Sequence, residues 1–581
     1  MTNKWNLRIS TPEELRERDE LATALPYSAV TCLLLVQRGI NSAEAAKSFF
    51  KTSVEDLNDP FLMPDMAAAV KRLNKALGEK ENILIYGDYD VDGTTAVTLV
   101  YKYLRHYSAN LDYYIPDRYD EGYGISYKGI DYAVEQGVTL IIVLDCGIKA
   151  VEKVAYAKTK GIDFIICDHH MPDKELPAAV AILDAKRTDS HYPYEHLSGC
   201  GVGFKFMQAF AGDNGFPNGD AEKLEQLYEL TAVSIASDIV PITGENRVLA
   251  YYGLRQLNSN PSLGFRGIIK VCGLSIGHIS INDLVFKIGP RLNASGRMMN
   301  GREAVDLLLA KDVESAREKS KSIDQYNDER RELDKKITDE ANAIIDHFTH
   351  MEDRKAIVVY DPGWHKGVIG IVASRLAEKY CRPTVVLCKS SSGLVTGSAR
   401  SVGGFDVYTA LESCRDLLDN FGGHTYAAGL SLREENLKIF IERFTAVAAE
   451  EIASDQMTPQ IDIDMLINLK DVNQQLLDEL KKMEPFGPDN QKPVFCSRRV
   501  RDFGTSKLVG KESEHIKLDI IDDSTALPVH AIAFGMHAYN DRIHAGLPFD
   551  LCYTIEENTY NKRKPCIQLM VKDIRMSEET E

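Results

Sequence analysis

The chain has 581 residues, of which 44% are hydrophobic and 27% are charged, and its formal net charge at pH 7 is −18. This length exceeds what a single hydrophobic core organises, so about three or four domains are expected. The sequence has no run of about 18 apolar residues, and its first residues, MTNKWNLRIS, hold no apolar signal core. We therefore expect no membrane contact and a cytoplasmic location.

The eleven cysteines are scattered, with no CxxC pair and no regular spacing. An odd count in this arrangement argues against a disulfide framework or a zinc ribbon, and it favours free thiols in a reducing compartment. The negative net charge argues against broad contact with nucleic-acid phosphates. It leaves room for a binding groove, because a groove needs only local basic residues.

Residues 1–75 are predicted to form a polar, helical N-terminal segment, with stretches such as PEELRERDELATAL and NSAEAAKSFF. From 76 to 300, short apolar runs alternate with helical segments, and the runs are NILIYGD, LDYYIPD, LIIVLDCG, FIICDHH and AAVAILDA. Continuous apolar runs between polar turns are typical of buried parallel strands, and their alternation with helices predicts an α/β domain. Ligands of such sheets bind at the carboxyl ends of the strands.

A charged segment without glycine or proline runs from 302 to 348 and predicts one or two long helices that connect domains over 301–350. A second α/β domain is predicted over 351–455, where AIVVYDPGWHKG and PTVVLCKS are the expected strands. Residues 456–581 hold short alternating runs such as HIKLDIID, LPVHAIAFG and FDLCYTIEE. These predict a small β-barrel of the OB type.

The stretch YGDYDVDG, residues 86–93, places Asp88, Asp90 and Asp92 directly after an apolar run. Neighbouring carboxylates repel one another unless a positive charge lies among them. For a single DxD, an acidic turn that caps a helix N-terminus would be the simpler interpretation. Three further apolar runs carry similar groups, which favours a metal: Asp145 in LIIVLDCG, Asp168, His169 and His170 in FIICDHH, and Asp238 in TAVSIASDIVP.

Carboxylates combined with imidazoles suit Mn²⁺ or Mg²⁺, and the absence of cysteine pairs argues against structural zinc. This set of aspartates and histidines is large enough for two ions that share a bridging carboxylate. Two such ions stabilise both the attacking and the leaving oxygen of a displacement at phosphorus. The predicted reaction is therefore hydrolysis of a phosphate ester or anhydride, and it requires no nucleophilic side chain.

In this order, DYDVDG, DCG, DHH and the later isolated aspartate resemble the motifs of the DHH phosphoesterases. DCG stands where DNG or DHG is more usual, but the aspartate is kept. By this resemblance the metal ligands are Asp90, Asp92, Asp145, His169 and Asp238. The resemblance also implies that Asp88 and His170 are ligands or adjacent catalytic groups, and that Asp168 orients a histidine, as carboxylates beside metal sites do.

Arginines in two further motifs are candidates for substrate binding. FKIGPRLNASGRM carries Arg291, Asn293 and Arg297 beside glycines, and IPDRYDEGYG carries Arg118. A tight loop with surface arginines is the simpler interpretation of the first motif. The functional interpretation is a phosphate clamp, for which planar guanidinium groups are suited.

The second α/β domain contains GSARSVGGFD and GGHTYAAG, and the latter resembles the GGHxxAAG signature of the DHH-associated domain. Glycines allow backbone N–H groups to approach phosphate closely, which makes Gly422 and Gly423 candidates for substrate contact. By the resemblance, Arg118, Ser398 and Arg400 hold the 5′ end of a strand, and Arg291 holds a phosphate near the scissile bond. His424 would bind or stabilise the reacting phosphate.

The order of the domains, with MEPFGPDNQKPVF and HIKLDI in the barrel, resembles the branch of the family that degrades single-stranded DNA. This implies a 5′→3′ exonuclease that uses two Mn²⁺ or Mg²⁺ ions and releases mononucleotides in DNA repair and recombination. It also implies work beside a helicase and a single-strand-binding protein. The basic stretches CSRRVRDFG and YNKRKP are either DNA contacts of the barrel or a solvated face.

Two alternatives remain from other branches of the family. One is a phosphodiesterase of short RNA or cyclic dinucleotides, although such proteins are generally shorter and lack the barrel. The other is a non-catalytic scaffold that binds single strands, which would be marked by loss of metal ligands.

Overall fold

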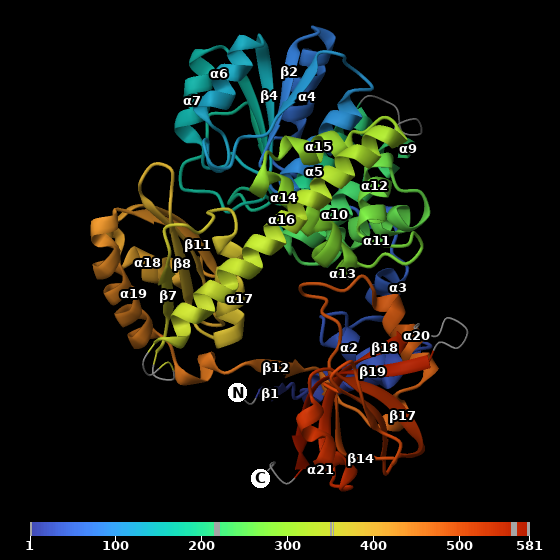
Figure 1. Cartoon of the computed structure of the whole chain (residues 1–581). Helices are drawn as coiled ribbons and strands as arrows, with labels where there is room; N and C mark the ends of the chain where they lie inside the picture. The colour runs from blue at the N-terminus through green and yellow to red at the C-terminus, as the bar shows by residue number, and fades with distance from the viewer. Residues whose placement is uncertain (1–2, 214–220, 349–350, 352–353, 559–565, 578–581) are drawn as a thin grey trace. The chain divides into compact units, whose positions relative to one another are not determined.

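The computed structural model describes residues 3–213, 221–348, 351, 354–558 and 566–577 (Figure 1). The chain divides into two compact units. The larger unit comprises Asn58–Val240 and Gly244–Pro459, and the smaller unit comprises Met1–Leu57, Pro241–Thr243 and Gln460–Glu581. Neither unit is therefore continuous in sequence.

The first part of the larger unit contains a parallel five-stranded sheet in the order β3-β2-β4-β5-β6. Its strands are β2 (Asn82–Gly87), β3 (Leu111–Tyr114), β4 (Val138–Leu144), β5 (Asp163–Cys167) and β6 (Ala181–Leu183). The apolar side chains of α6 (Tyr127–Glu135) and α7 (Val151–Thr159) pack on one face (Figure 1). α4 (Met66–Gly78), α5 (Val91–Leu104) and α8 (Gly199–Asp213) pack against the strands from the other side. Because both faces are covered, the strands are continuous apolar runs, and the predicted α/β domain is confirmed.

Helices follow this sheet and lead to the long connecting helix. They are α9 (Ala221–Glu225), α10 (Tyr228–Asp238), α11 (Gly244–Ser259), α12 (Leu263–Val271), α13 (Ile281–Asp283), the π-helical turn η3 (Leu284–Ile288), α14 (Gly289–Met298) and α15 (Arg302–Leu308). α16 (Val313–Asp346) has 34 residues, which corresponds to about 50 Å. It packs against α12 and α14 and then against α17 (Ile369–Tyr380), so it links the two α/β parts of the larger unit.

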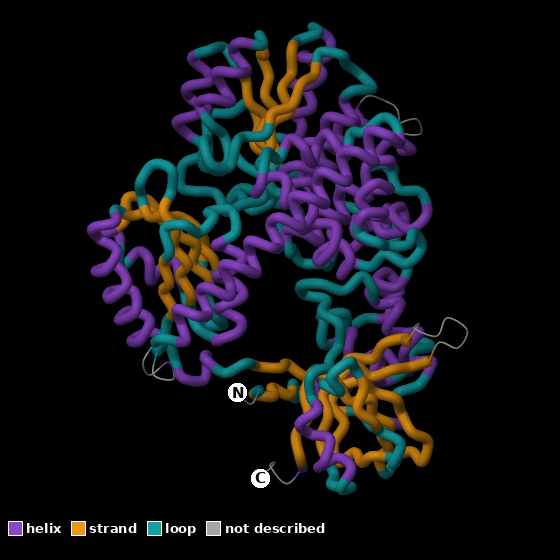
Figure 2. Tube along the Cα trace, in the orientation of Figure 1, coloured by secondary structure: helices purple, strands orange, loops and turns teal. Residues whose placement is uncertain are grey.

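The second sheet has the order β10-β11-β9-β8-β7, and only β7 and β8 run parallel. Its strands are β7 (Ile357–Tyr360), β8 (Thr384–Lys389), β9 (Val395–Arg400), β10 (Leu418–His424) and β11 (Ala427–Leu432). α17 shares an apolar core with one face of β7 and β8, together with the last turns of α16. α18 (Val407–Glu412) and α19 (Leu437–Glu451) cover the other face (Figure 2).

The smaller unit is built on an OB-type barrel. Its strands are β14 (Phe495–Asp502), β16 (His515–Asp522), β17 (Thr525–Ala533), β18 (Phe549–Asn558) and β19 (Cys566–Met576), with the short β13 (Met465–Leu466) and β15 (Lys507–Val509) at the ends of the sheet. The barrel closes because β14 pairs with β18 on one side and with β16 on the other. The unit also contains α20 (Gln474–Met483) and α21 (Asn540–His544).

The N-terminal region differs from the prediction of one helical segment over residues 1–75. β1 (Lys4–Leu7) pairs in parallel with β12 (Gln460–Ile463), and the indole Nε1 of Trp5 donates to Asp573 at 2.8 Å. α1 (Pro12–Ala24), α2 (Ala29–Val36) and α3 (Ala43–Phe50) pack into the barrel core, whereas α4 belongs to the larger unit. The reason is that α2 is apolar on all sides, and the barrel supplies the cover that it needs.

Within the described residues, every helix is too short or too polar to cross a bilayer.

Candidate metal centre and nucleotide site

The predicted ligands meet at the carboxyl edge of three neighbouring strands. Asp88 follows β2, Asp145 follows β4, and Asp168, His169 and His170 follow β5, and these three strands are adjacent in the sheet. Asp90 is the N-cap of α5 and accepts from the Gly93 amide at 3.1 Å, and Asp92 lies in the first turn of that helix. Asp238 is the last residue of α10, which packs against α5. The structure thus brings together residues that are as much as 150 positions apart in the chain (238 − 88 = 150).

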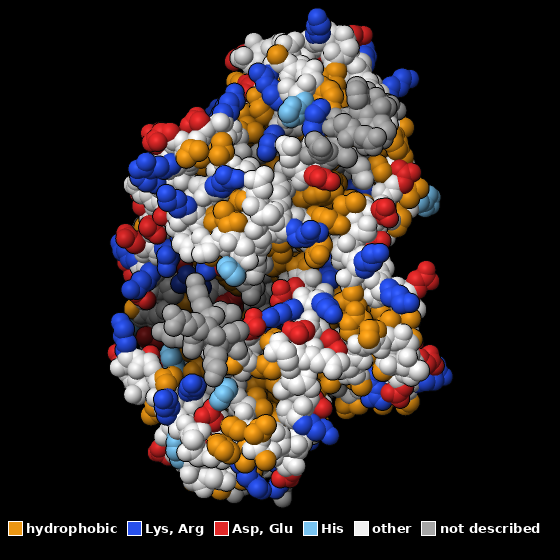
Figure 3. Space-filling view, turned by 90° about the vertical axis from the view of Figure 1, so that its right-hand side faces the viewer, with side chains coloured by type: hydrophobic (Ala, Val, Ile, Leu, Met, Phe, Trp, Pro, Cys, Tyr) orange, Lys and Arg blue, Asp and Glu red, His pale blue; other side chains and the backbone are white. Residues whose placement is uncertain are grey.

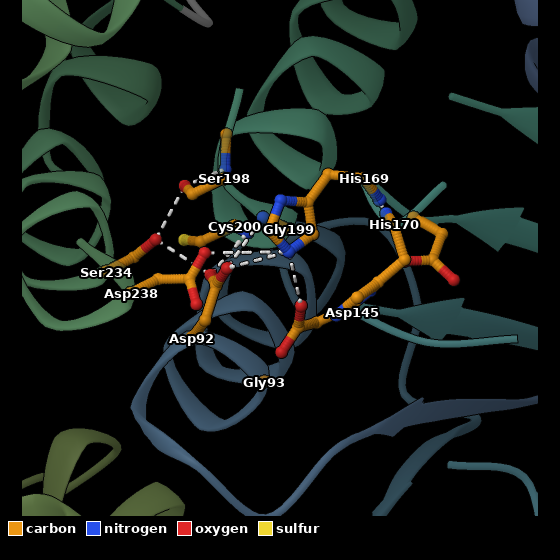
Figure 4. Close-up of polar contacts among 12 residues, drawn as sticks. Asp92, Gly93, Asp145, His169, His170, Ser198, Gly199, Cys200, Ser234 and Asp238 are labelled. Atoms are coloured by element: carbon orange, nitrogen blue, oxygen red, sulfur yellow. Dashed lines mark hydrogen bonds and ion pairs between the residues drawn. The ribbon is translucent and has the colours of Figure 1, made fainter. Parts of the chain in front are cut away.

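His169 lies at the centre of this group, with three carboxylates around its ring (Figure 4). Its Nε2 is 3.1 Å from Asp145 Oδ1, 3.6 Å from Asp238 Oδ2 and 3.8 Å from Asp92 Oδ2. Among the described residues, neither ring nitrogen of His169 has a hydrogen-bond partner, and Oδ1 of the buried Asp88 has none either. Buried polar atoms without partners are costly, so these atoms are suited to ligating a cation.

Three sets of side chains have ligand atoms within 4.8 Å of one another. The sets are Asp88, Asp90 and Asp145; Asp92, His169 and Asp238; and Asp145, His169 and His170. Asp145 and His169 each belong to two sets. This overlap fits two ions that share a bridging carboxylate, and the donors are the oxygen and imidazole ligands that Mn²⁺ accepts.

The electrostatics of the site also favour a cation. Burial raises the pKa values of Asp88, Asp90, Asp145 and Asp238, and the charges of the neighbouring aspartates raise them further. Burial lowers the pKa of His169 to about 4, which keeps the ring neutral and able to ligate. Divalent cations would relieve the repulsion between these carboxylates.

Asp92 and Asp168 are held by hydrogen bonds from other parts of the fold. Asp92 accepts from the amides of Gly199 and Cys200 at 2.7 and 2.8 Å and from the Ser234 hydroxyl at 2.7 Å. Asp168 accepts from the Ile148 amide at 2.9 Å and lies 2.7 Å from His170 Nδ1. Burial opposes charge on His170, but the hydrogen bond to Asp168 raises its pKa to about 9. Asp168 therefore contacts the His170 ring, as expected of a carboxylate that orients a histidine.

Several site residues had no signal in the sequence. The Tyr123 hydroxyl donates to the Asp145 carbonyl at 3.1 Å and lies 3.2 Å from His170 Nε2. Lys186 Nζ donates to the His169 carbonyl at 2.5 Å. Tyr123 lies in IPDRYDEGYG and Ser234 in TAVSIASDIVP, but both stretches drew attention through another residue, and Lys186 lies outside the quoted stretches. Only the tertiary structure identifies these three residues.

Two backbone features explain the local sequence. Asp145 has φ 61°, in the left-handed region where Asp and Asn are favoured over most residues other than glycine. A Cβ on Gly93 would lie 2.4 Å from the Asp88 carbonyl oxygen. The aspartate turn therefore folds back on the start of α5 so closely that only glycine fits there.

The GPRLNASGRM motif forms helix α14, not the tight loop with surface arginines of the simpler interpretation. Arg291 Nε donates to Asp324 of α16 at 2.7 Å, and Asn293 Oδ1 is buried without a hydrogen-bond partner in the described part of the chain. Arg297 donates to the Gly367 carbonyl at 2.9 Å. Burial lowers the pKa of Arg297 to about 9, and the positive charge of Arg118 lowers it further.

Arg297 belongs to a group of three arginines, whose other members, Arg118 and Arg400, are predicted to bind the 5′ end. Arg118 stacks on Tyr89, with 4.7 Å from its guanidinium carbon to the ring centroid. Arg400 donates to Ser398 Oγ at 2.8 Å and to Ser374 Oγ at 3.1 Å. Burial and the charge of Arg118 lower the pKa of Arg400. Within the described chain none of these three arginines has an ion-pair partner, so the group has an excess of positive charge.

A cavity of about 600 Å³ adjoins the predicted metal ligands. Asp168, His170 and Tyr123 lie on one side of it, and Gly422, Gly423 and His424 of β10 lie on the other. Lys149 and Lys153 add positive charge to its lining. Burial lowers the pKa of His424, as do the charges of His170 and Lys149. The structure therefore places GGH of the second α/β part beside the metal centre.

The basic barrel stretch CSRRVRDFG lies on and just after β14, where Arg498, Arg499 and Arg501 are exposed. The other stretch, YNKRKP, lies outside the described residues. On the face of the molecule in Figure 3, Lys and Arg side chains are interspersed with Asp and Glu.

Three family models match successive parts of the chain. The DHH family N-terminal domain matches residues 82–235, the DHHA1 domain matches 353–450, and the RecJ OB domain matches 463–573. These matches coincide with the parallel-sheet part, the second α/β part and the barrel.

Curated relatives align along nearly the whole chain. The single-stranded-DNA-specific exonuclease RecJ of Bacillus subtilis is 36% identical over 580 residues, which cover 100% of this chain and 72% of the relative. RecJ of Haemophilus influenzae is 32% identical over 543 residues, which cover 91% of this chain and 93% of the relative.

Solved structures show the same fold. RecJ of Thermus thermophilus in complex with Mn²⁺ has a TM-score of 0.82 at 24% identity, covering 98% of this chain and 79% of that one. An exonuclease RecJ bound to manganese has a TM-score of 0.59 at 29% identity, covering 68% of this chain and 98% of that one.

Proposed function

Because this chain belongs to the RecJ family of single-stranded-DNA-specific exonucleases, we propose that it hydrolyses single-stranded DNA from the 5′ end and releases mononucleotides. The observation that carries the proposal is the overlap of three ligand sets on Asp145 and His169, beside arginines that have no ion-pair partner among the described residues. The first feature suits metal-dependent chemistry at phosphorus, and the second suits a terminal phosphate.

Two Mn²⁺ or Mg²⁺ ions would be held by Asp90, Asp92, Asp145, His169 and Asp238, with Asp88 and His170 at the edge of the set. When bound, such ions supply Lewis-acid stabilisation of the attacking and leaving oxygens at phosphorus. A relative that is 29% identical has been solved with manganese, which supports this choice of ion. Asp168 orients His170, and Ser234 fixes the carboxylate of Asp92.

The chain's own cations would position the strand. Arg118, Ser398 and Arg400 bind the 5′-phosphate, and the positive charge of Arg297 strengthens this site. Arg291 and Asn293 contact a phosphate near the scissile bond. The amides of Gly422 and Gly423 and the ring of His424 bind the reacting phosphate from the opposite side of the cavity.

The barrel would bind the strand farther from its 5′ end, through basic residues such as Arg498 and through stacking. Because such an enzyme acts only on single strands, it needs a helicase to open duplex DNA and meets single-strand-binding protein on its substrate. We propose that this work belongs to DNA repair and recombination in the cytoplasm.

The test uses the purified protein with Mn²⁺ or Mg²⁺ and three substrates: a 5′-labelled single strand, a 3′-labelled single strand and a blunt duplex. We expect early release of labelled mononucleotide from the 5′-labelled strand while the duplex stays intact. If long strands survive but short RNA or cyclic dinucleotides are cleaved, the substrate assignment is wrong. If strands are bound and nothing is cleaved, the protein is a binding scaffold.

A further inference from the structure

The face of the second sheet that carries Ser398 and Arg400 also carries His424. Residues paired directly across neighbouring strands lie on the same face. The strand register defines two rows of paired residues that cross β9, β11 and β10. The rows are Ser398–Gly429–Gly422 and Arg400–Ala427–His424. Ser398 is paired on its other side with Val386, which is buried in the core beneath α17. The rows thus begin beside α17 and end at the cavity.

Between the two ends of these rows lies an area that we call bare, because its residues Gly422 and Gly429 have no side chains. Gly422 and Gly429 are paired with each other and are both exposed. A Cβ on Gly422 would meet no atom within 4 Å, and one on Gly429 would meet only the Gly397 carbonyl oxygen at 4.0 Å. Neither has a positive φ. The fold therefore gives no steric or conformational reason for glycine at these two positions.

Gly423 provides the contrast, since it has φ 151° and its Cβ would lie 2.3 Å from the Ala427 carbonyl oxygen. The fold itself requires glycine there. Glycine in a strand is destabilising relative to alanine, because it loses more conformational freedom on folding. Two paired glycines without a structural reason indicate that a ligand approaches the backbone closely.

The two ends of the bare area carry complementary groups. Arg400 and Ser398 lie at the β9 end, and His424 lies at the β10 end beside the metal centre. The strands are about 4.8 Å apart, so the rows are about 10 Å long. One nucleotide with a phosphate on each side can bridge this span.

We propose that the 5′-terminal nucleobase lies flat on the bare backbone of Gly422 and Gly429, and that Gly429 is a positioning residue because it leaves room for the base. The inference deepens the proposed function and rests on it. A flat backbone floor accepts any base, because every base has a π-face and the two glycines carry no polar side chain that could select one. The floor would fix one nucleotide between the 5′-phosphate site and the metal centre, which accounts for release of mononucleotides.

The test is a steric one, with Gly429→Ala and Gly429→Val and with Gly78→Val as the matched control. Gly78 ends α4, has no atom within 4 Å of an added Cβ and has no positive φ, so it tests the same change away from the sheet. Two 5′-phosphorylated strands are compared, one normal and one whose terminal residue lacks its base. Thermal unfolding and calorimetric Mn²⁺ binding are measured for each protein.

We expect unchanged protein to cleave the normal strand about tenfold faster in kcat/KM than the strand without the base, from loss of one base contact. Gly429→Val should lower kcat/KM on the normal strand by about 100-fold, since displacement by about 1 Å has that effect. The same variant should keep most of its activity on the strand without the base, where space for the valine remains. On the normal strand, the kcat/KM of Gly429→Ala should fall between those of Gly429→Val and the unchanged protein. The kcat/KM of Gly78→Val should match that of the unchanged protein.

Three outcomes would overturn the inference. Equal cleavage of the normal strand by Gly429→Val and unchanged protein would show that nothing lies on the floor. Equal losses on both strands would assign the glycine a structural role, as would a fall in Mn²⁺ affinity. If unchanged protein fails to cleave the normal strand, the proposed function itself is wrong, and the inference falls with it.

Discussion

At the scale of single residues, the metal centre depends on Asp145, which has a ligand atom in two of the three sets and lies 3.1 Å from His169. Its φ of 61° explains why asparagine is the appropriate replacement, since asparagine tolerates this conformation and alanine does not. A change at this position therefore tests the missing charge without adding backbone strain.

We predict that Asp145→Asn lowers Mn²⁺ affinity and kcat by more than about 100-fold, because it removes the negative charge of a shared ligand. Affinity for a long single strand should stay within about threefold, since the barrel would hold the strand. Calorimetry, single-turnover cleavage and fluorescence anisotropy measure these quantities. Asp328→Asn, on the exposed side of α16, is the control and should behave like unchanged protein. Full turnover by Asp145→Asn would remove the shared-ligand hypothesis.

The raised carboxyl pKa values predict how metal binding depends on pH. Folded, metal-free protein keeps protons on Asp88, Asp145 and Asp238 that the unfolded chain releases above about pH 4. Its free energy of unfolding therefore falls as pH rises above that value. Cations replace these protons, so the rise in Tm caused by Mn²⁺ should be larger at pH 8 than at pH 6. Scanning calorimetry with and without Mn²⁺ measures this, and a pH-independent rise would contradict it.

At the scale of elements, the turn from β2 into α5 is shaped by a glycine whose neighbours leave no room. The Cβ of Gly93→Ala would lie 2.4 Å from the carbonyl oxygen of Asp88 and 2.7 Å from its amide nitrogen. Both contacts are with backbone, so relief requires movement of the whole aspartate turn.

We predict that Gly93→Ala destabilises the protein by about 1–3 kcal/mol, as overpacking does. It should also weaken Mn²⁺ binding by more than about tenfold, because Asp90 and Asp92 flank the displaced turn. Chemical denaturation and calorimetry give the two values. Gly78→Ala adds a methyl group where no atom lies within 4 Å, so it should change neither the stability nor the Mn²⁺ affinity. Normal Mn²⁺ affinity in Gly93→Ala would mean that the turn adjusts without moving its ligands.

At the scale of the whole molecule, the N-terminal helices belong to the barrel unit although the whole catalytic part of the sequence separates them from it. Leu34 and Leu35 of α2 are fully buried in the same core as Phe495 and Leu551 of the barrel. Removing residues 460–581 alone would therefore expose the apolar side chains of α2 to water.

We predict that truncation after Pro459 yields an aggregating protein, whereas a chain of residues 58–459 remains monomeric. The shorter chain should cleave oligonucleotides of a few residues at close to the normal kcat, because the ligands lie in the larger unit. Its affinity for long strands should fall by more than about tenfold, from loss of several stacked bases. Light scattering, cleavage assays and anisotropy measure these outcomes. Unchanged affinity for long strands would refute a DNA-binding role of the barrel.

The sequence by itself determined the two α/β parts, the barrel and the clustering of the aspartates and histidines at the strand ends. These features are local: an apolar run predicts a buried strand, and parallel strands place the residues that follow them at one edge of the sheet. The sequence alone therefore predicts that Asp88, Asp145 and His169 lie close together, and the strand order confirms this. Composition also sufficed for α16, since all 34 residues of the observed helix lie inside the charged segment without glycine or proline.

Only the tertiary structure decided which distant parts of the chain contact one another. The helical form of GPRLNASGRM, the Ser234 bond to Asp92 and the burial of α1–α3 in the barrel unit depend on contacts between distant residues. The different roles of Gly422 and Gly423 illustrate the physical reason. The two are adjacent and chemically identical in the sequence, and only the positions of surrounding atoms show that the fold requires one and leaves the other free for a ligand.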